Sequence, residues 1–343
     1  MKSGTKRMLK KFKSIQFKRM DKMIAVISRE NNNRPAWRIK LDMMGSFLRY
    51  GTGYTDYFFN NFAQLTPAEK RTFVTAKSFY NVLHYLNDQH YIGLFHDKLI
   101  FNHYFREYLH RDYLNLLRCS DADVAEFLQK FPVVFAKDPV GEGGHGVTRV
   151  VSAEVTDAAA FRQQRLQNKQ YLLEEGIVQC DALNELNPSV VNSLRIVTLV
   201  KDNQSHLLNT ALRMNQDKKD VIGCTDDVYC GIGADGRINS NVVDDFGNIY
   251  DRHPLTGKKF SEVVLPHMDQ AIEMCLRAAL EVPQVRYVGW DIAFSVNGPL
   301  IVEGNEYPGY MLLQYYKLNG KRTGHLKEIQ DIIGDEVYQI KKY

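Results

Sequence analysis

The sequence predicts an α+β protein in which a helical N-terminal region precedes a strand-rich remainder. Hydrophobic residues recur at helical spacing through much of residues 35–130. From Val133 onward, runs of β-branched residues alternate with Gly, Asn and Asp turns, which is typical of sheet. Of the 343 residues, 44% are hydrophobic and 24% are charged. These values disfavour both a disordered chain and a fibre.

The first 20 residues are strongly basic, with eight Lys and Arg residues and no acid. Because the whole chain carries a formal charge of +4, the remainder is net acidic. Apolar residues fall loosely at helical spacing among these bases, so a basic amphipathic helix could contact an anionic membrane. The alternative is a solvated, frayed terminus. The net acidic remainder has no basic stripe, which disfavours nucleic-acid binding.

Segments that would place the protein in or across a membrane are not expected. No stretch of about 20 apolar residues is found, and the basic N-terminus lacks the apolar region of a secretory signal. The five cysteines include no C-x-x-C pair, which argues against a zinc site and a disulfide framework. We therefore expect a cytoplasmic protein with free thiols, and the alternative is a peripheral position at the inner face of the membrane.

The helical region carries one clear start signal. Thr66-Pro67-Ala68-Glu69 has the pattern of a capping box, with Thr66 at the N-cap and Pro67 in the first helical position. Apolar residues then follow at helical spacing as far as Leu86. Further helices are expected over Asp121–Lys130 and Met268–Leu280.

A glycine-rich segment follows the first predicted strand, Val133–Lys137. Residues 141–146 read Gly-Glu-Gly-Gly-His-Gly and lead into Val147–Val151, whose residues favour a strand. A dinucleotide fingerprint would have to open a helix, so this segment predicts a hairpin instead. Glycines allow backbone N–H groups to approach phosphate oxygens, and Lys137 would add a positive charge there. The alternative is a flexible turn beside a solvated lysine.

Two acids and an amide stand on a second predicted hairpin, residues 287–305. A two-residue Asn-Gly turn would pair Val296 with Pro299 and place Asp291 and Glu303 on opposite faces. A three-residue loop would pair Ser295 with Pro299 instead. We prefer that loop because it gives each face a consistent character.

With the three-residue loop, Asp291 faces Glu303 and Asn305 shares their face. Ile292, Phe294, Leu300 and Val302 would fill the other face. Facing carboxylates repel each other, and a divalent cation between them removes that cost. The oxygen donors suit Mg²⁺ with bridging phosphates. The alternative is a polar outer face with incidental acids.

Taken in order, these segments resemble an ATP-grasp enzyme, and most closely the sugar-transfer associated ATP-grasp family linked to polysaccharide biosynthesis. The resemblance covers about residues 45–315 and implies two α+β lobes that clasp the nucleotide. It rests on Gly51–Tyr57, His96–Lys98, Lys137 with the 141–146 loop, Glu174–Ile177, Asn192–Thr198, Gly289–Asp291 and Glu303–Asn305. It implies four units, namely a basic segment over 1–30, a helical region over 31–130, a glycine-loop lobe over 131–178 and a C-terminal lobe with the metal site over 179–343.

The resemblance also implies roles for individual residues. The nucleotide would be held by Lys98, Lys137, Gly143, Gly144, His145, Gly146 and a hinge of Leu173, Glu174, Glu175 and Ile177, which reads adenine through backbone groups. Asp181 would fall near the ribose, although several registers are open. Arg195 and Arg213 would join Lys137 as catalytic cations. Asp291, Glu303 and Asn305 would bind Mg²⁺. Where an asparagine and paired glycines are expected, Asp227 and Cys230 stand instead, which puts that loop's role in doubt.

The resemblance implies an ADP-forming ligase that joins a carboxylate and an amine through an acylphosphate. ATP and Mg²⁺ would be required. The partners would be an amino acid or amine and a small-molecule or nucleotide-linked sugar, in surface polysaccharide or capsule biosynthesis. Two alternatives remain open, namely a kinase that phosphorylates a sugar or lipid hydroxyl, with Asp227 as the base, and a non-catalytic nucleotide-binding module.

Overall fold

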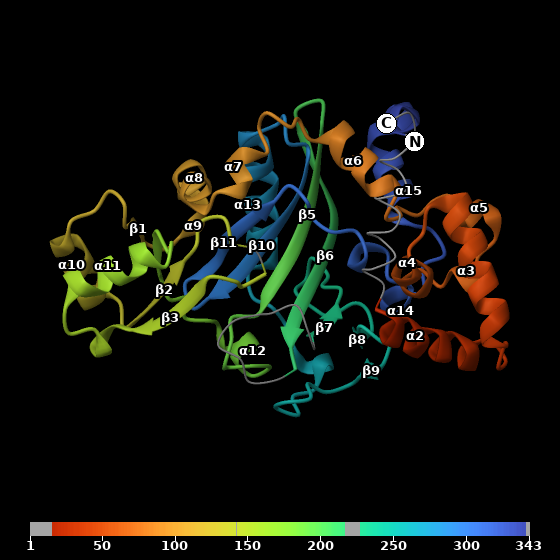
Figure 1. Cartoon of the computed structure of the whole chain (residues 1–343), viewed down its shortest axis with the longest axis horizontal. Helices are drawn as coiled ribbons and strands as arrows, with labels where there is room; N and C mark the ends of the chain where they lie inside the picture. The colour runs from red at the N-terminus through yellow and green to blue at the C-terminus, as the bar shows by residue number, and fades with distance from the viewer. Residues whose placement is uncertain (1–15, 142, 217–226, 341–343) are drawn as a thin grey trace.

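The computed structural model describes residues 16–141, 143–216 and 227–340 and contains two antiparallel sheets with helices packed around them (Figure 1). The small sheet lies toward one end of the molecule, and the helices of residues 17–70 lie at the other. This arrangement confirms the predicted α+β class with a helical N-terminal region. Residues 1–15 of the basic segment, Glu142 of the glycine loop, and Asp226 lie outside the described residues.

The larger sheet has seven strands in the order β11-β10-β5-β6-β7-β8-β9, all antiparallel. They are β5 (Ser193–Lys201), β6 (Gln204–Asn215), β7 (Asp227–Cys230), β8 (Val242–Asp244), β9 (Ile249–Tyr250), β10 (Tyr287–Ser295) and β11 (Gly298–Asn305). Helix α13 (Met268–Glu281) packs on one face of this sheet through small side chains such as Ala271 and Ala278. Part of the opposite face is left open to form the floor of a cleft.

The smaller sheet has the order β1-β4-β2-β3 and is also antiparallel. Its strands are β1 (Tyr113–Asn115), β2 (Val133–Lys137), β3 (Val147–Val151) and β4 (Leu172–Glu175). Helices α10 (Asp121–Lys130) and α11 (Ala158–Gln167) cover it and share its apolar core. Strand β1 lies within the range that the sequence assigned to the helical region, because its three residues are too few to show a strand pattern.

The remaining helices lie mostly before the small sheet and after the large one. They are α2 (Phe17–Glu30), α3 (Ala36–Tyr50), α4 (Tyr54–Phe59), α5 (Pro67–Lys70), α6 (Ser78–Leu86), α7 (Gly93–His96), α8 (Lys98–Tyr104), α9 (Arg106–Leu109), α12 (Asp181–Asn184), α14 (Tyr316–Asn319), α15 (His325–Ile333) and α16 (Val337–Ile340). None of the helices within the described ranges is both long and apolar enough to cross a membrane.

The N-terminal helices pack against the large sheet and its C-terminal helices. Side chains of α2 and α4 share a core with Tyr229 and Val243 of the sheet and with Tyr315. Residues of α6 pack with β5 and with α15. The aromatic residues between Tyr50 and Phe62 lie in the first of these clusters, as the sequence suggested.

The helical pattern after Thr66 corresponds to two helices. The capping box is present, since Thr66 accepts a hydrogen bond from the Glu69 N–H and Glu69 bonds the Thr66 N–H. Helix α5 nevertheless ends at Lys70, and α6 begins only at Ser78. Between them, the buried Gln314 side chain bonds both backbone groups of Val74. These tertiary hydrogen bonds replace the ladder that a continuous helix would have formed. The helices predicted over 121–130 and 268–280 are present.

The second hairpin has the predicted pairing of Asp291 with Glu303, but the predicted turn is wrong. Ser295 pairs with Gly298, so the turn contains two residues, Val296 and Asn297. The extra residue lies in strand β11 instead, where it forms a β-bulge. Ile292 pairs with Ile301, but the preceding Asp291 pairs with Glu303, so one residue of β11 is skipped. The bulge restores the pairing that a regular two-residue hairpin would have lost.

The bulge also changes which residue enters the core. Val302, expected in the core, lies at the cleft, and Ile301 is buried in its place. Ile292, Phe294 and Leu300 are buried as predicted. The four described cysteines are free, as expected, and Cys224 lies outside the described residues.

Asn87 fixes the position of the β10–β11 hairpin relative to α6. Its buried amide donates to the carbonyls of Tyr287 and Glu306 at 2.9 and 2.8 Å, and its oxygen accepts from the Tyr287 N–H at 2.8 Å. These bonds hold the start of β10 and the residue that follows β11. Loss of the side chain would leave buried backbone groups unpaired.

We therefore predict that Asn87→Ala lowers the free energy of unfolding by about 3 kcal/mol, because three buried hydrogen bonds are lost. Urea denaturation followed by circular dichroism measures this change. The exposed neighbour Gln89 is the matched control, and Gln89→Ala should change stability by less than about 0.5 kcal/mol. Equal effects of the two substitutions would contradict the role given to Asn87.

Candidate functional site

A cleft of about 530 Å³ lies between the two sheets. The small sheet contributes residues of β2, β3 and β4 with the glycine loop, and the large sheet contributes Ser193, Arg213, Asp291 and Glu303. Lys98 and Arg111 reach it from the helical region. The cleft therefore brings together most of the segments that the sequence singled out.

The glycine loop connects β2 to β3 as the predicted hairpin. Gly143, Gly144 and Gly146 have positive φ angles, which other residues rarely adopt. A Cβ on Gly141 would lie 2.5 Å from the His145 carbonyl oxygen, so the loop could not close as tightly with another residue. Gly141, Gly143 and Gly144 line the cleft.

Two members of the predicted loop set lie elsewhere. His145 is exposed and is not among the residues that line the cleft. The Gly146 carbonyl accepts hydrogen bonds from the Asp138 N–H and from Gln170 Nε2, so Gly146 stabilises the base of the loop.

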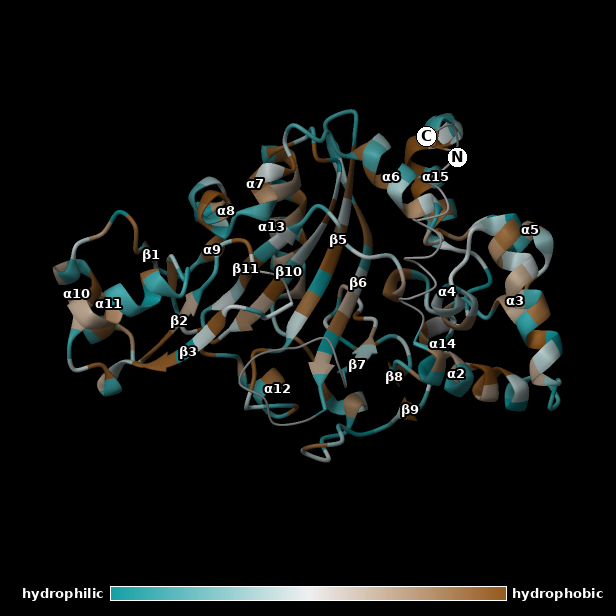
Figure 2. Cartoon of the chain, in the orientation of Figure 1, coloured by the Kyte–Doolittle hydropathy of each residue, from teal (hydrophilic) through white to brown (hydrophobic). Residues whose placement is uncertain are grey.

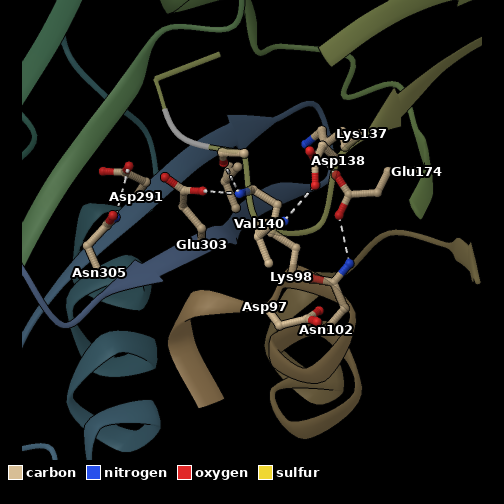
Figure 3. Close-up of polar contacts among 12 residues, drawn as sticks. Asp97, Lys98, Asn102, Lys137, Asp138, Val140, Glu174, Asp291, Glu303 and Asn305 are labelled. Carbon is tan, nitrogen blue, oxygen red and sulfur yellow. Dashed lines mark hydrogen bonds and ion pairs between the residues drawn. The ribbon is translucent and has the colours of Figure 1, made fainter. Parts of the chain in front are cut away.

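Lys98 connects the glycine loop to the β10–β11 hairpin. It is the first residue of α8, whose N-terminus is capped by the Asp97 carboxylate through the N–H groups of Leu99 and Ile100. Lys98 Nζ donates to the Gly141 carbonyl at 2.6 Å and lies 3.9 Å from Glu303 Oε2 (Figure 3). This lysine therefore lies between the glycine loop and one of the predicted metal ligands.

Close packing of α8 on β11 sets this position. A Cβ on Gly304 would lie 2.9 Å from Phe101 and 3.0 Å from Phe95. Glycine at that position lets the helix approach the strand next to Glu303.

Lys137 is held by a buried carboxylate. Its Nζ lies 2.5 Å from Glu174 Oε2, and Glu174 Oε1 accepts from Asn102 at 2.7 Å and from Arg111 at 2.9 Å (Figure 3). Burial alone would raise the pKa of Glu174, but the charges of Arg111 and Lys137 lower it below its ordinary value. Glu174 is therefore an anion that orients a cleft-facing lysine.

The Glu174 side chain makes more contacts than the sequence suggested, since it was expected to matter less than the backbone of the hinge. Asn102 and Arg111 were not predicted at all. Asn102 lies four residues after Lys98, and such residues share one face of a helix, so this signal was available. Arg111 follows a short helix with no motif around it, and no sequence signal identifies it.

Arg111 also joins the two sheets. Its side chain is 2% exposed and donates to the carbonyls of Ile301 at 2.6 Å and Val302 at 3.0 Å, in addition to Glu174. These carbonyls belong to the bulged segment of β11. Arg111 therefore satisfies backbone acceptors at the bulge while it neutralises a carboxylate of β4.

The predicted hinge residues border the cleft. Glu174, Glu175 and Ile177 line it, whereas Leu173 is fully buried in the small-lobe core. The Glu175 carboxylate accepts a hydrogen bond from the Asp112 N–H, which lies beside the same small sheet. Asp181 is exposed on α12 and does not line the cleft, although its neighbours Gln179 and Asn184 do. The structure therefore does not bring Asp181 together with the other candidates.

The metal-site candidates lie on adjacent strands at the floor of the cleft. Asp291 and Glu303 are paired residues, and Asn305 Nδ2 donates to Asp291 Oδ2 at 3.3 Å (Figure 3). Burial and the Asp291 charge raise the pKa of Glu303, although 35% of its side chain is exposed through the opening. Within the described ranges, no group of three or more His, Cys, Asp or Glu side chains is arranged to hold a metal, so the donor set here is two carboxylates and an amide.

The two predicted catalytic arginines have different positions. Arg195 Nε and Nη2 donate to the two Asp291 oxygens at 2.5 and 3.0 Å, and Nη1 donates to the Pro308 carbonyl at 2.7 Å. Arg195 therefore orients Asp291 and is not among the residues that line the cleft. Arg213 does line it, and its Nε donates to Asp227 Oδ2 at 2.5 Å.

The segment in doubt, around Asp227 and Cys230, is structural where it is described. Asp227 is 2% exposed and accepts from both Arg213 and Asn215. The Cys230 side chain lies in the core of the large sheet, and burial raises the pKa of its thiol. The Gly51–Tyr57 motif also lies away from the cleft lining, and its Asp56 accepts from Gly53, Ala76 and Tyr310.

The chain is similar to several known proteins. Solved structures that resemble the chain include the ATP-grasp ligase PsnB complexed with minimal precursor, with 16% identity over 65% of this chain and 55% of that chain and a TM-score of 0.38. D-alanyl-alanine synthetase A from Vibrio cholerae has 10% identity over 71% of this chain and 66% of that one, with a TM-score of 0.41. The D-alanine-D-alanine ligase from Coxiella burnetii has 11% identity over 73% and 60%, with a TM-score of 0.42.

This chain thus spans between about half and two thirds of each of those chains. A search of curated proteins found no match. The family model for sugar-transfer associated ATP-grasp proteins matches residues 83–330, which is more than half of the chain. The expected ATP-grasp fold is thereby confirmed, and the chain belongs to the sugar-transfer associated ATP-grasp family.

Proposed function

We propose that this protein is an ATP-dependent carboxylate–amine ligase that forms an amide through an acylphosphate. One observation carries the proposal. The facing carboxylates Asp291 and Glu303 lie in the same cleft as Lys98, Lys137 and the glycine loop. Opposed acids below two lysines and a loop of closely spaced backbone amides form a site suited to a metal-bound polyphosphate.

The donor set fits Mg²⁺. Asp291, Glu303 and Asn305 would hold the ion, since all three present oxygen atoms and two are carboxylates whose mutual repulsion a cation removes. When bound, Mg²⁺ supplies neutralisation of the charge on the transferred phosphoryl group. Arg195 keeps Asp291 in the orientation required for this role by bonding both of its oxygens.

The nucleotide phosphates would lie between the two lysines and the loop. Lys98 is already directed at the loop through the Gly141 carbonyl, and Glu174 holds Lys137 at the cleft. The adenine would lie against the hinge of Glu174, Glu175 and Ile177, where backbone groups can read its edge. Closure of the loop would exclude water from the reacting groups.

The chemistry requires no nucleophile from the protein. An oxygen of the substrate carboxylate attacks the γ-phosphorus of ATP, the bond to the β-phosphate oxygen breaks, and ADP leaves. A substrate amine then attacks the carbonyl carbon of the acylphosphate, phosphate leaves, and the amine nitrogen loses a proton. The contribution of the protein is positioning and electrostatic stabilisation, in which Lys137 and the cleft-lining Arg213 carry the positive charge.

The proposed substrates follow from family membership. A uronic acid, free or nucleotide-linked, would be joined to an amino acid or amine, or an amino acid would be activated and placed on an amino sugar. The setting would be the assembly of a surface polysaccharide or capsule in the cytoplasm. Mass spectrometry of reactions that contain ATP, Mg²⁺, pooled amino acids and nucleotide sugars would identify the product.

One observation weakens the kinase alternative. A kinase base must be available to a substrate hydroxyl, and Asp227 is buried with hydrogen bonds from Arg213 and Asn215. Release of free phosphate together with ADP supports the ligase, whereas a phosphorylated product supports the kinase. ATP binding without turnover over a broad panel of acceptors would support a non-catalytic module.

We predict that the double substitution Asp291→Asn with Glu303→Gln abolishes Mg²⁺-dependent ADP release, since it removes both anionic ligands. Coupled detection of ADP measures turnover, and thermal melting checks that the variant folds. The matched control changes two exposed acids far from the cleft, Glu126→Gln with Asp331→Asn, and should retain full activity. Unchanged turnover in the first variant would reject the metal site.

The repulsion between the two acids predicts an opposite effect on stability. Because its pKa is raised in the folded state, Glu303 destabilises the metal-free protein at pH values above its ordinary pKa, and this cost disappears as the pH falls to that value or below. Glu303→Gln should therefore raise the melting temperature of the metal-free protein at neutral pH and have little effect near pH 4. Addition of Mg²⁺ and ADP should stabilise the native protein more than the variant. A variant that melts lower at neutral pH without metal would contradict this prediction.

Glu174 should affect both stability and nucleotide binding. Glu174→Gln leaves the buried Arg111 and the cleft lysine Lys137 without their anion, which should cost about 3 kcal/mol of unfolding free energy. We also expect a higher KM for ATP, because Lys137 is no longer held at the cleft. Glu126→Gln is the matched control and should change both quantities little, since this exposed glutamate is not among the residues that line the cleft. Equal behaviour of the two variants would argue against the role of Glu174.

A further inference from the structure

Helix α3 exposes a stripe of large apolar side chains. Trp37, Leu41, Met44 and Leu48 follow each other at spacings of four, three and four residues, so they lie on one face of the helix. Their exposed fractions are 59%, 53%, 56% and 76%. We call these four residues the α3 stripe. The helix lies at the outer edge of the molecule, at the end away from the small sheet (Figures 1 and 2).

The opposite face of α3 is fixed to the protein. Ile39 and Ser46 are buried. The Asp42 carboxylate accepts from the Tyr57 hydroxyl at 2.6 Å and lies 3.9 Å from Lys70 Nζ. Burial of the stripe by rotation of the helix would break these contacts, so the exposure of the stripe is a stable property of the fold.

Positive charge flanks the stripe, mainly on one side. At 100° per residue, Arg38 and Arg49 fall on that side, and Lys40, whose Nζ lies 3.1 Å from Asp21 Oδ1 of α2, falls on the other. The guanidinium of Arg38 lies 5.2 Å from the Trp37 ring centroid, which keeps this charge beside the stripe. The only acid of the helix, Asp42, is the residue that bonds Tyr57 on the inner side.

We propose that the α3 stripe docks on the surface of an anionic lipid bilayer. An apolar face with basic flanks and a Trp residue is the pattern of helices that lie in the plane of a membrane interface. The basic residues beside the stripe match the charge of anionic headgroups. A protein that bound the same stripe would need an apolar groove with acidic residues around its rim. The proposal does not depend on the proposed function.

Vesicle binding by the full chain tests this docking. Vesicles of phosphatidylcholine with phosphatidylglycerol should sediment the protein, and vesicles of phosphatidylcholine alone should do so much less. Of the two tryptophans in the chain, Trp290 is buried and Trp37 is exposed. A blue shift of tryptophan fluorescence on binding therefore reports entry of Trp37 into the interface. Leu41→Asp with Leu48→Asp should weaken binding by about tenfold or more and remove the shift.

The matched control carries the same charge change at exposed leucines outside α3. Leu117→Asp with Leu280→Asp should bind vesicles as the native chain does. Circular dichroism melts show whether both double variants fold. Unchanged sedimentation of the stripe variant, or binding without a blue shift, would overturn the proposal and assign binding to the basic segment alone. A stable dimer in solution that the stripe variant dissociates would also overturn it, in favour of a second copy of this chain.

Discussion

The arrangement of the site depends on the buried guanidinium of Arg111. It bonds Glu174 of β4 and the carbonyls of Ile301 and Val302 in the bulged part of β11. The bulge in turn makes Asp291 face Glu303 across a two-residue hairpin. One side chain thus links the lobe that carries the glycine loop to β11, the strand that carries Glu303 and Asn305. Because a buried charge requires a partner, loss of Glu174 would leave the buried guanidinium of Arg111 without an anion.

The charges of the cleft alternate in sign. Glu174 lies between Arg111 and Lys137, Glu303 is approached by Lys98, and Asp291 is held by Arg195. These contacts keep the cations in place in a protein without ligand. Glu303 differs from Glu174 because its pKa is raised and not lowered. The acid with surplus negative charge is the one expected to meet Mg²⁺, and the fully compensated acid is the one that supports a lysine.

Local patterns in the sequence predicted the fold class, the glycine hairpin and the pairing of Asp291 with Glu303. These features depend on strand alternation and turn residues, which are visible over short windows. The turn of the second hairpin was assigned wrongly because one extra residue in the turn and one extra residue in a β-bulge both pair Asp291 with Glu303. The helix after Thr66 was predicted too long because Gln314, distant in sequence, bonds Val74. Arg111 was missed for the same reason, since its partners lie 63 and about 190 residues away.

The N-terminal helices connect the proposed membrane surface on α3 to the β10–β11 hairpin and the segment that follows it. Asp42 of α3 bonds Tyr57 of α4, and Asp56 on the same short helix accepts from Tyr310, in the segment that follows β11. Asn87, at the end of α6, bonds Glu306 in that same segment. Since these partly buried polar contacts have few alternative geometries, α3 and the cleft keep a fixed relation to each other. A chain docked on a bilayer through α3 would therefore present its cleft to the surroundings in one orientation.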